Sequence, residues 1–327
     1  MRISGHIEKL FQRISLRFQL SFKVLLAPLI RVFETLYLRP SSSSRRGDID
    51  PVFIIGAPRT GSTILYQALT NLYDVQYVDN VACSWCRNLR FGMWLSTKKY
   101  GDAPHNNFNA DYGGTERFGG HAPSECGEFW YRWLPTDRHF LDHQDVTARM
   151  RHGIKTELRG IANFSRKPLI LKNLNAGQRL RLLKQVCPGA RFIFVRRDPR
   201  FVTQSIIAAR KKFGVREHEW WSIKPPNVSD LVSLPELEMC VAQVYFLERQ
   251  IEKDLKLFPN ENVREVHYQE LDEKKIWELG RWIGAVSRPE SKLPVFHKDK
   301  LEKLSTQNLE QLDELVNKYP FKKELFV

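Results

Sequence analysis

Short apolar runs alternate with helical patterns along most of this chain. The apolar runs have the length and composition of buried strands, and they lie at 52–55 (VFII), 168–172 (PLILK), 191–195 (RFIFV) and 263–268 (VREVHY). Helical patterns follow the runs, at about 61–71, 177–186, 199–213 and 304–319. Strands that alternate with helices predict an α/β fold of three layers, in which a central parallel sheet is flanked by helices.

Two other stretches complete the predicted domain. A long helix is expected from residue 233 to about 258, with Ser233 as its N-cap, because Ser233 and Glu236 have the spacing of a capping box. The stretch from about 80 to 150 has little periodicity and is rich in Gly, His, Trp and Phe. We interpret this stretch as an irregular insertion that lines a cavity.

The N-terminal region differs in composition from the rest. A polar stretch at 39–50 (RPSSSSRRGDID) reads as a linker. We therefore divide the chain into a basic arm with its linker at residues 1–48 and a single domain at 49–327. Within the arm, the segment FKVLLAPLIRVFETLYL has no uncharged run close to the roughly 20 residues of a membrane span. Two interpretations stay open: a surface helix packed on the domain, or an interfacial helix that contacts anionic lipid through residues 1–40.

The overall charge predicts anionic partners. The chain has 51 Lys and Arg against 37 Asp and Glu, a formal net charge of +14. Nucleic acid, an acidic membrane surface and a multiply charged nucleotide all fit this charge. No basic motif interleaved with aromatic residues is visible, so nucleic acid is not an expected partner.

Cysteine usage bears on location and on metal binding. Five cysteines without the spacing of a disulfide framework favour a reducing compartment, so we expect a cytoplasmic protein. The lipid-contact interpretation of the arm would place it at the membrane periphery. Cys83 and Cys86 form a CxxC pair, but no second ligand pair lies at a useful spacing. We therefore expect no metal site.

The run FIIGAPRTGST, residues 53–63, carries the first chemical signal. A strand, a turn and a helix in this order let backbone N–H groups and the helix N-terminus hold a phosphate-like group, as in a P-loop. Compared with the Walker motif, Gly56, Gly61 and Thr63 fit, but Ser62 stands where the phosphate-binding lysine belongs. A kinase-like phosphotransferase would therefore lack its main cation, and Arg59 remains as the cation of the loop.

GAPRTGST resembles the phosphosulfate-binding loop of the sulfotransferases that use 3′-phosphoadenosine-5′-phosphosulfate. FIFVRRDPRFVTQS is similar to the 3′-phosphate site of the same family, with Arg197 before Asp-Pro and Ser205 eight residues later. The resemblance covers roughly residues 52–285 and is nearest to the bacterial and tyrosylprotein branch. It implies a hydroxyl (or amine) acceptor, which could be a carbohydrate, lipid, phenol or peptide, and an acceptor pocket formed by the insertion at 80–150. The donor-binding residues that it implies are Arg59, Thr60, Gly61, Ser62, Thr63, Arg197 and Ser205.

The resemblance also implies catalytic residues. Lys172, in LILKNLN, takes the position of the family's active-site lysine, although Leu174 replaces the family's proline. For the general base, Asp79 and the pair His121 and Glu125 are alternatives, since carboxylates and imidazoles both act in this role when held within hydrogen-bond reach.

Two further predictions concern the acceptor wall and the class of protein. Trp220, Trp221 and Lys224 are candidates for one wall of the acceptor pocket, because aromatic faces bind rings and apolar groups. The competing classes are a kinase-like phosphotransferase and a non-catalytic protein that binds anionic surfaces.

Overall fold

A computed structural model describes residues 22–38, 50–289, 291–300 and 306–326 of the chain. Its centre is a four-stranded parallel sheet in the order β2-β1-β3-β4. The strands are β1 (Val52–Gly56), β2 (Ile170–Lys172), β3 (Arg191–Arg196) and β4 (Val263–His267). All four predicted strands are present and all neighbours are parallel, so the predicted α/β class is confirmed.

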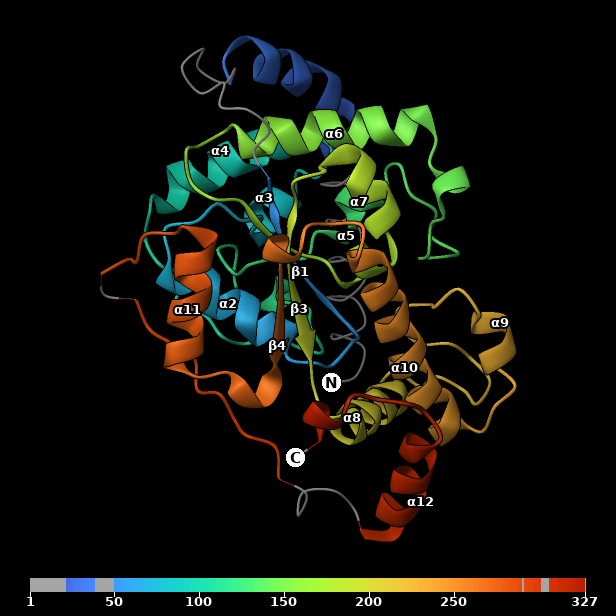
Figure 1. Cartoon of the computed structure of the whole chain (residues 1–327). Coiled ribbons are helices and arrows are strands. Elements are labelled where there is room, and N and C mark those ends of the chain that lie inside the picture. The colour runs from blue at the N-terminus through green and yellow to red at the C-terminus, as the bar shows by residue number, and fades with distance from the viewer. Residues whose placement is uncertain (1–21, 39–49, 290, 301–305, 327) are drawn as a thin grey trace, which may run out of the picture.

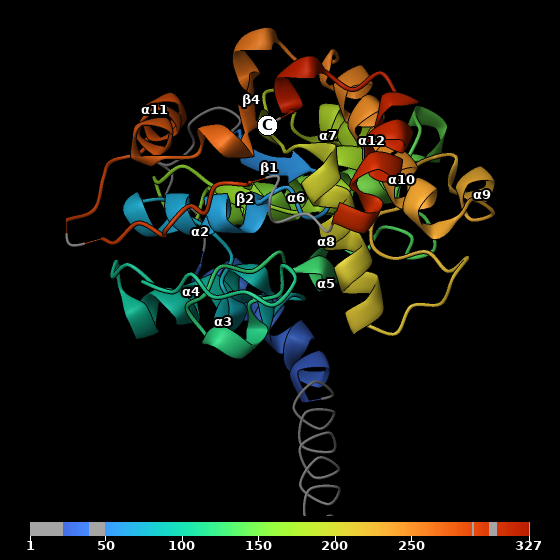
Figure 2. The same cartoon turned by 90° about the horizontal axis from the view of Figure 1, so that it is seen from below.

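Alternate residues of the strands enter two separate cores, as the pleat requires. Phe53 and Ile55 of β1 face a core with α6 (Ala148–Ala162), α7 (Leu180–Val186) and α10 (Glu236–Leu255). Val52 and Ile54 face a second core with α2 (Ser62–Leu72) and α11 (Glu273–Ile283). Figures 1 and 2 show α2 and α11 on one side of the sheet and α7 and α10 on the other. The predicted three-layer arrangement is therefore confirmed.

The remaining helices frame these layers. They are α3 (Asn80–Cys83), α4 (Leu89–Tyr100), α5 (Gly127–Trp130), α8 (Pro199–Lys212), α9 (Val228–Leu231) and α12 (Thr306–Asn317). α4 is a regular helix inside the stretch predicted to be irregular, and α6 lies where no element was predicted. The C-terminal segment from α12 packs against α10 through Leu312, Leu315 and Val316.

The capping box predicted at the start of α10 is wrong. The N-cap is Pro235, without a side-chain hydrogen bond, and the Ser233 hydroxyl donates instead to the carbonyl oxygen of Asp230. Ser233 therefore belongs to the turn after α9. Pro235 is suited to the position before a helix, since its fixed φ and missing N–H cost nothing there.

The described part of the arm is a helix over residues 22–36, named here the arm helix. Arg31 of this helix pairs with Glu157 of α6, and the buried Glu34 accepts from the N–H of Phe91 in α4. Phe33 contacts the rings of Phe91 and Trp94. These contacts pack the arm helix on the domain and do not decide between the two interpretations of its outer face, whereas the predicted linker lies, except for residue 50, outside the described residues. None of the helices in the described ranges is both long enough and apolar enough to cross a bilayer.

Candidate active site

The predicted anion loop joins β1 to α2 at the carboxyl end of the sheet. Gly61 is the N-cap of α2 with φ +90°, and a Cβ there would lie 2.4 Å from the ring of Tyr268. Arg59 has φ +70°, a conformation that non-glycine residues adopt at a cost and that is frequent at functional sites. The loop therefore directs backbone N–H groups and the positive end of α2 into one space.

The side chains of Arg59, Arg197 and Ser205 converge beside this loop. Arg59 Nε donates to Ser205 Oγ at 2.9 Å, and Arg197 Nη1 donates to the carbonyl oxygen of Arg59 at 3.0 Å. Burial lowers the pKa of Arg59, and the neighbouring Arg197 lowers it further, while Tyr112 and Asp111 oppose the shift. Two cations and a hydroxyl that come from positions 59, 197 and 205 thus lie together as one cationic group.

Arg197 is also held from the C-terminal side of the chain. Its Nε donates to Asp299 Oδ2 at 2.7 Å, its Nη2 contacts the other oxygen of the same carboxylate, and its guanidinium lies 4.6 Å from the centre of the Tyr268 ring. Asp299 is almost fully buried. The face of Arg197 that would grip a phosphate in a bidentate manner is therefore occupied by a carboxylate.

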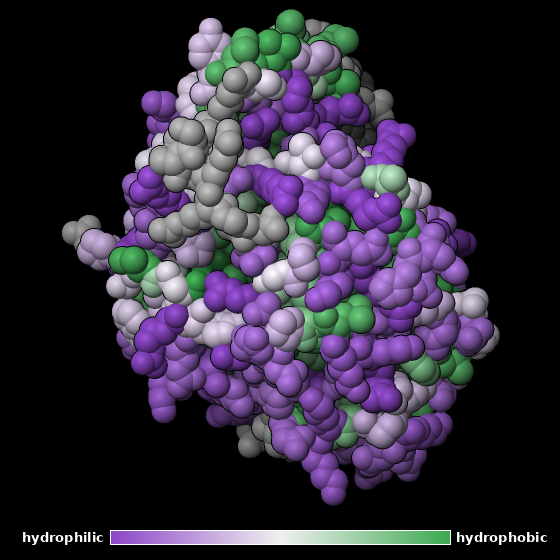
Figure 3. Space-filling model, turned by 45° about the horizontal axis from the view of Figure 1, so that its top comes forward, coloured by the Kyte–Doolittle hydropathy of each residue, from purple (hydrophilic) through white to green (hydrophobic). Residues whose placement is uncertain are grey.

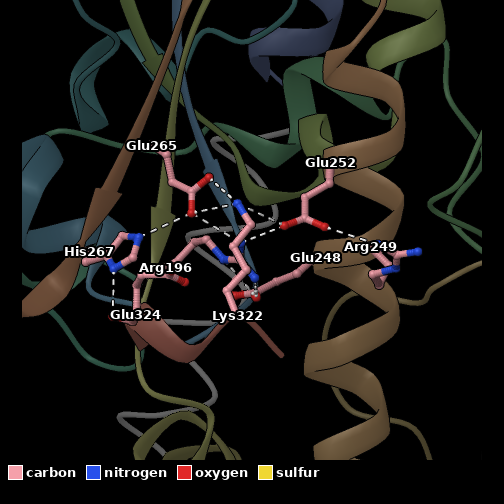
Figure 4. Close-up of polar contacts among 8 residues, drawn as sticks. All are labelled: Arg196, Glu248, Arg249, Glu252, Glu265, His267, Lys322 and Glu324. Carbon is pink, nitrogen blue, oxygen red and sulfur yellow. Dashed lines mark hydrogen bonds and ion pairs between the residues drawn. The ribbon is translucent and has the colours of Figure 1, made fainter. Parts of the chain in front are cut away.

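The residue before Arg197 anchors the end of β3. Arg196 is buried and pairs with Glu248 at 2.7 Å, Glu252 at 2.6 Å and Glu265 at 3.2 Å, and Lys322 contacts two of these carboxylates (Figure 4). Burial raises the pKa of Glu248 to about 7, although Arg196 acts in the opposite direction. This network ties β3 to α10 and β4, so the backbone that presents Arg197 is fixed on both sides.

Lys172, Thr63 and Glu125 form a second polar group on the other side of the loop. Lys172 Nζ donates to Thr63 Oγ1 at 3.0 Å and forms an ion pair in direct contact with Glu125 Oε1. The Lys172 side chain is 1% exposed, whereas that of Glu125 is 32% exposed. A Cβ on Gly113 would lie 3.6 to 3.9 Å from the polar atoms of these three side chains, so the turn at Gly113 lies over them.

The structure does not bring the other two base candidates to this group. Asp79 is buried, accepts from the N–H of Ala82 at 2.8 Å as the N-cap of α3, and contacts the Ser96 hydroxyl. His121 stacks on Tyr100, with ring centres 4.2 Å apart. Both residues line a separate cavity of about 350 Å³ that does not include Lys172 or the loop. Burial raises the pKa of Asp79 to about 6 and lowers that of His121 to about 4.

The loop hydroxyls have different environments. Thr60 is fully buried and donates to the carbonyl oxygen of Ala57 at 3.0 Å, so its side chain braces the loop. Ser62 and Thr63 line the main cavity, together with Gly61 and Arg59. The hydroxyls of Ser62 and Thr63 therefore face the space that the loop surrounds, whereas Thr60 offers only its backbone.

Two cavities meet at Arg197 and Tyr268. The main cavity, of about 500 Å³, contains the loop, Lys172 and Glu125, and the second, of about 360 Å³, contains Ser205 and Asp299. Both are lined by Arg197 and Tyr268, so the two cavities adjoin at these side chains. The size of the main cavity is typical of sites for small organic molecules.

Aromatic and imidazole side chains that were not predicted as site residues line the main cavity. They are Phe108, Tyr112, Tyr131 and His139. Of the predicted acceptor wall, Trp221 lines the cavity, whereas Trp220 and Lys224 do not line it, and Trp220 Nε1 donates to the carbonyl oxygen of Ile223. Burial lowers the pKa of His139 to about 4. Only the aromatic richness of the stretch at 80–150 pointed toward these residues.

Cys83 of the CxxC pair lies near two possible ligands that spacing did not reveal, whereas Cys86 does not belong to this group. Among the described residues, the side chains of Cys83, Cys126 and Glu128 bring possible ligand atoms within 4.8 Å of one another. Three ligand atoms are one short of the four that a structural zinc site takes. The expectation of no metal site stays a prediction.

Three features define the class of protein: the predicted anion loop after β1, a cationic group from β3 and α8, and a buried lysine at the end of β2. Together they are typical of an enzyme with a P-loop-like fold that transfers an anionic group. The sequence matches the model of the sulfotransferase family over residues 51–281, more than half of the 327 residues. The chain belongs to the sulfotransferase family and is therefore a transferase of sulfuryl groups. This membership decides against the phosphotransferase and the non-catalytic alternatives.

Solved structures share the fold. Sulfotransferase STF9 from Mycobacterium avium aligns over 90% of this chain and 73% of its own, with a TM-score of 0.50 and 14% identity. Sulfotransferase STF1 from Mycobacterium tuberculosis H37Rv aligns over 83% and 76%, with a TM-score of 0.51 and 14% identity. A search of curated protein sequences finds no significant match. At these identities the likeness shows the fold alone, and the nearness to the tyrosylprotein branch stays a prediction.

Proposed function

We propose that this sulfotransferase takes its sulfuryl group from 3′-phosphoadenosine-5′-phosphosulfate and transfers it to a hydroxyl (or amine) acceptor. The observation that carries the proposal is the convergence of Arg59, Arg197 and Ser205 in adjoining cavities next to the N-terminus of α2. A nucleotide with anionic groups at both its 5′ and 3′ positions matches two anion sites that share one arginine. The loop at 56–63 would hold the 5′-phosphosulfate, and Arg197 with Ser205 would hold the 3′-phosphate.

Lys172 and Glu125 would carry the transfer step. The acceptor oxygen attacks sulfur, an oxygen–sulfur bond forms, and the bond from sulfur to the bridging oxygen of the 5′-phosphate breaks. Lys172 Nζ would stabilise the negative charge that develops on the bridging oxygen. Glu125, whose carboxylate is partly exposed in the same cavity, would accept the acceptor's proton. We prefer Glu125 to Asp79 and His121 because only Glu125 contacts Lys172.

The aromatic lining of the main cavity fits a ring-bearing acceptor. Phe108, Tyr112, Tyr131 and Trp221 present aromatic surface to the main cavity. Aromatic faces bind sugar rings and apolar groups alike, so a carbohydrate, a phenol, a ring-bearing lipid or a tyrosine side chain of a peptide is the acceptor class that we propose to test. We also propose that sulfuryl transfer in this site needs no metal. The cytoplasmic location of the protein stays a prediction.

A transfer assay tests the proposal. The full-length protein would be incubated with donor radiolabelled in its sulfur and a panel of one phenol, one carbohydrate, one lipid and one tyrosine peptide, with and without a chelator. We expect label on at least one acceptor, unchanged by the chelator and lost in the Glu125→Gln variant. Label transfer from wild type and Glu125→Gln at equal rates would overturn the assignment of the base, and loss of transfer with the chelator would overturn the metal-free reaction.

A further inference from the structure

The outer face of the arm helix is an unusual concentration of exposed apolar side chains. Seven of the eleven large hydrophobic residues that are exposed in the described structure lie between residues 22 and 37. Five of them recur at spacings of three and four residues and form the apolar stripe: Phe22, Leu25, Leu29, Val32 and Leu36. Leu25 is 75% exposed and Leu29 is 69% exposed. Figure 3 shows hydrophobic atoms gathered at the upper edge of that view, over the arm helix, with hydrophilic atoms next to them.

The stripe is broader than a seam for pairing two helices. Val24, Pro28 and Tyr37 are also exposed and widen the apolar face. A coiled coil is expected only when the heptad pattern continues over at least three to four heptads, and within residues 22–38, the described part of the arm, the stripe covers about two. A broad apolar face on a helix that is fixed to a domain is the form of an interfacial helix.

The helices beneath the stripe are strongly basic. Figure 1 shows α6 next to the arm helix, and the contacts of Arg31 and Glu34 tie the arm helix to both α6 and α4. Residues 22–38, 87–100 and 148–166 together contain eleven Lys and Arg and two acidic residues. The two acidic residues, Glu34 and Glu157, are buried and paired with Arg31. The acidic charge of these segments is therefore inside, and their exposed charge is positive.

We infer that the arm helix, the exposed Arg87 just before α4, and the exposed basic residues of α4 and α6 form a docking surface for an anionic lipid membrane. The stripe would enter the boundary between headgroups and acyl chains, and the basic residues would contact the headgroups. The sequence before Phe22 adds Arg2, Lys9, Arg13 and Arg17 against Glu8, which extends the same charge. The inference does not depend on the proposed donor or acceptor.

Charge also separates lipid from the other possible occupants. A second copy of the chain would bring two strongly positive faces together, which electrostatic repulsion opposes. Residues 1–21 of the same chain also carry a net positive charge, so repulsion opposes their binding to this face as well. Nucleic acid would satisfy the charge but would leave the apolar stripe in water. An anionic lipid surface satisfies both features at once.

Flotation with lipid vesicles tests the inference on the full-length protein. Vesicles of phosphatidylcholine alone would be compared with vesicles that also contain phosphatidylglycerol. We expect binding to the mixed vesicles and little binding to phosphatidylcholine alone. The triple variant Leu25→Ser, Leu29→Ser, Leu36→Ser should partition into the mixed vesicles at least about 100-fold more weakly. The reason is that it lacks three leucine side chains that the membrane would bury. The double variant Arg87→Gln, Arg149→Gln should bind the mixed vesicles about 20-fold more weakly.

Val286→Ser, Val295→Ser is the matched control, because these valines are 73% and 74% exposed and lie outside the arm helix. This control should bind like wild type. Wild type that stays in solution with both vesicle types, or a triple variant that binds like wild type, would overturn the inference. Two other results would overturn it as well: a wild-type dimer that the triple variant turns into a monomer, and tighter binding to duplex DNA than to the mixed vesicles.

Discussion

The two sides of the active site are built in different ways. The donor side consists of the turn after β1 and of the segment from the end of β3 into α8, and each of its candidate ligands lies within nine residues of a strand end. The acceptor side consists of residues between about 108 and 139 and of Trp221, which come from turns without regular structure. The proposed donor binding therefore uses local geometry fixed by the sheet, whereas the proposed acceptor binding and proton transfer depend on contacts between distant segments. Variants on the two sides should therefore fail in different ways.

The largest losses of kcat are expected at Glu125 and Lys172, where the donor side and the acceptor side meet. Glu125→Gln should lower kcat about 10³-fold, because a positioned general base contributes roughly 10² to 10⁴. Lys172→Ala should lower kcat about 10²-fold or more, because a cation that stabilises developing charge is lost. Neither variant should change the affinity for 3′-phosphoadenosine-5′-phosphate more than a few-fold, and calorimetry together with steady-state rates checks both. Asp79→Asn is the comparison variant, and a larger loss of kcat in Asp79→Asn than in Glu125→Gln would reverse our choice of base.

The next effect concerns the donor side alone. Arg197→Ala should weaken binding of the same bisphosphate about 100-fold, since a bidentate charge-assisted contact is lost. Arg216→Ala is the control, because Arg216 is 83% exposed and pairs only with the neighbouring Glu219 in the described structure. If calorimetry gives equal dissociation constants for Arg197→Ala and wild type, Arg197 does not bind the 3′-phosphate.

A smaller change in affinity for the bisphosphate, in the opposite direction, is expected when Asp299 is replaced. Its carboxylate occupies the guanidinium face of Arg197 and must give way to a phosphate. Asp299→Asn should therefore bind the bisphosphate about 5-fold more tightly, which corresponds to about 1 kcal/mol. Weaker binding in this variant would mean that Asp299 orients Arg197 for the nucleotide instead of competing with it.

The last expected effect is a pH dependence of stability at Asp79, outside both sides of the active site. Burial raises the pKa of Asp79 to about 6 from its ordinary value of 3.8, although hydrogen bonds from the Ala82 N–H and the Ser96 hydroxyl oppose the shift. The folded protein therefore binds more protons at this site than the unfolded chain, and the contribution of Asp79 to the free energy of unfolding falls as pH rises from about 4 to 6. In Asp79→Asn this fall should be smaller by about 2 kcal/mol. Urea titrations at several pH values measure how the free energy of unfolding changes with pH. An identical change with pH in wild type and Asp79→Asn would show that Asp79 does not titrate in this range.

Much of the fold and of the donor side could be predicted from the sequence. The strands are short apolar runs between turn residues, and all four were found. Helix α6 was missed although Ile154, Leu158 and Ile161 recur at helical spacing and Thr147 caps its start. At the start of α10 the capping-box pattern misled, because Pro235 takes the N-cap position two residues after Ser233.

The acceptor side could be predicted only as a region. Glu125 and Lys172 are 47 residues apart, and no local pattern states that they meet. Asp79 and His121 carry suitable chemistry in the sequence, but Asp79 caps α3 and His121 stacks on Tyr100 in another cavity. Residue type alone does not distinguish a base from a cap, because tertiary packing decides which carboxylate reaches the lysine.

The most direct test of the account is a calorimetric titration of the full-length protein with 3′-phosphoadenosine-5′-phosphate, in parallel with ATP and without magnesium. We expect tight binding of the bisphosphate, a weak response to ATP, and loss of the preference in Arg197→Ala. Absence of bisphosphate binding, or equal binding of ATP and the bisphosphate, would contradict the claim that the loop at 56–63 and the pair Arg197 and Ser205 bind one sulfuryl-donor nucleotide.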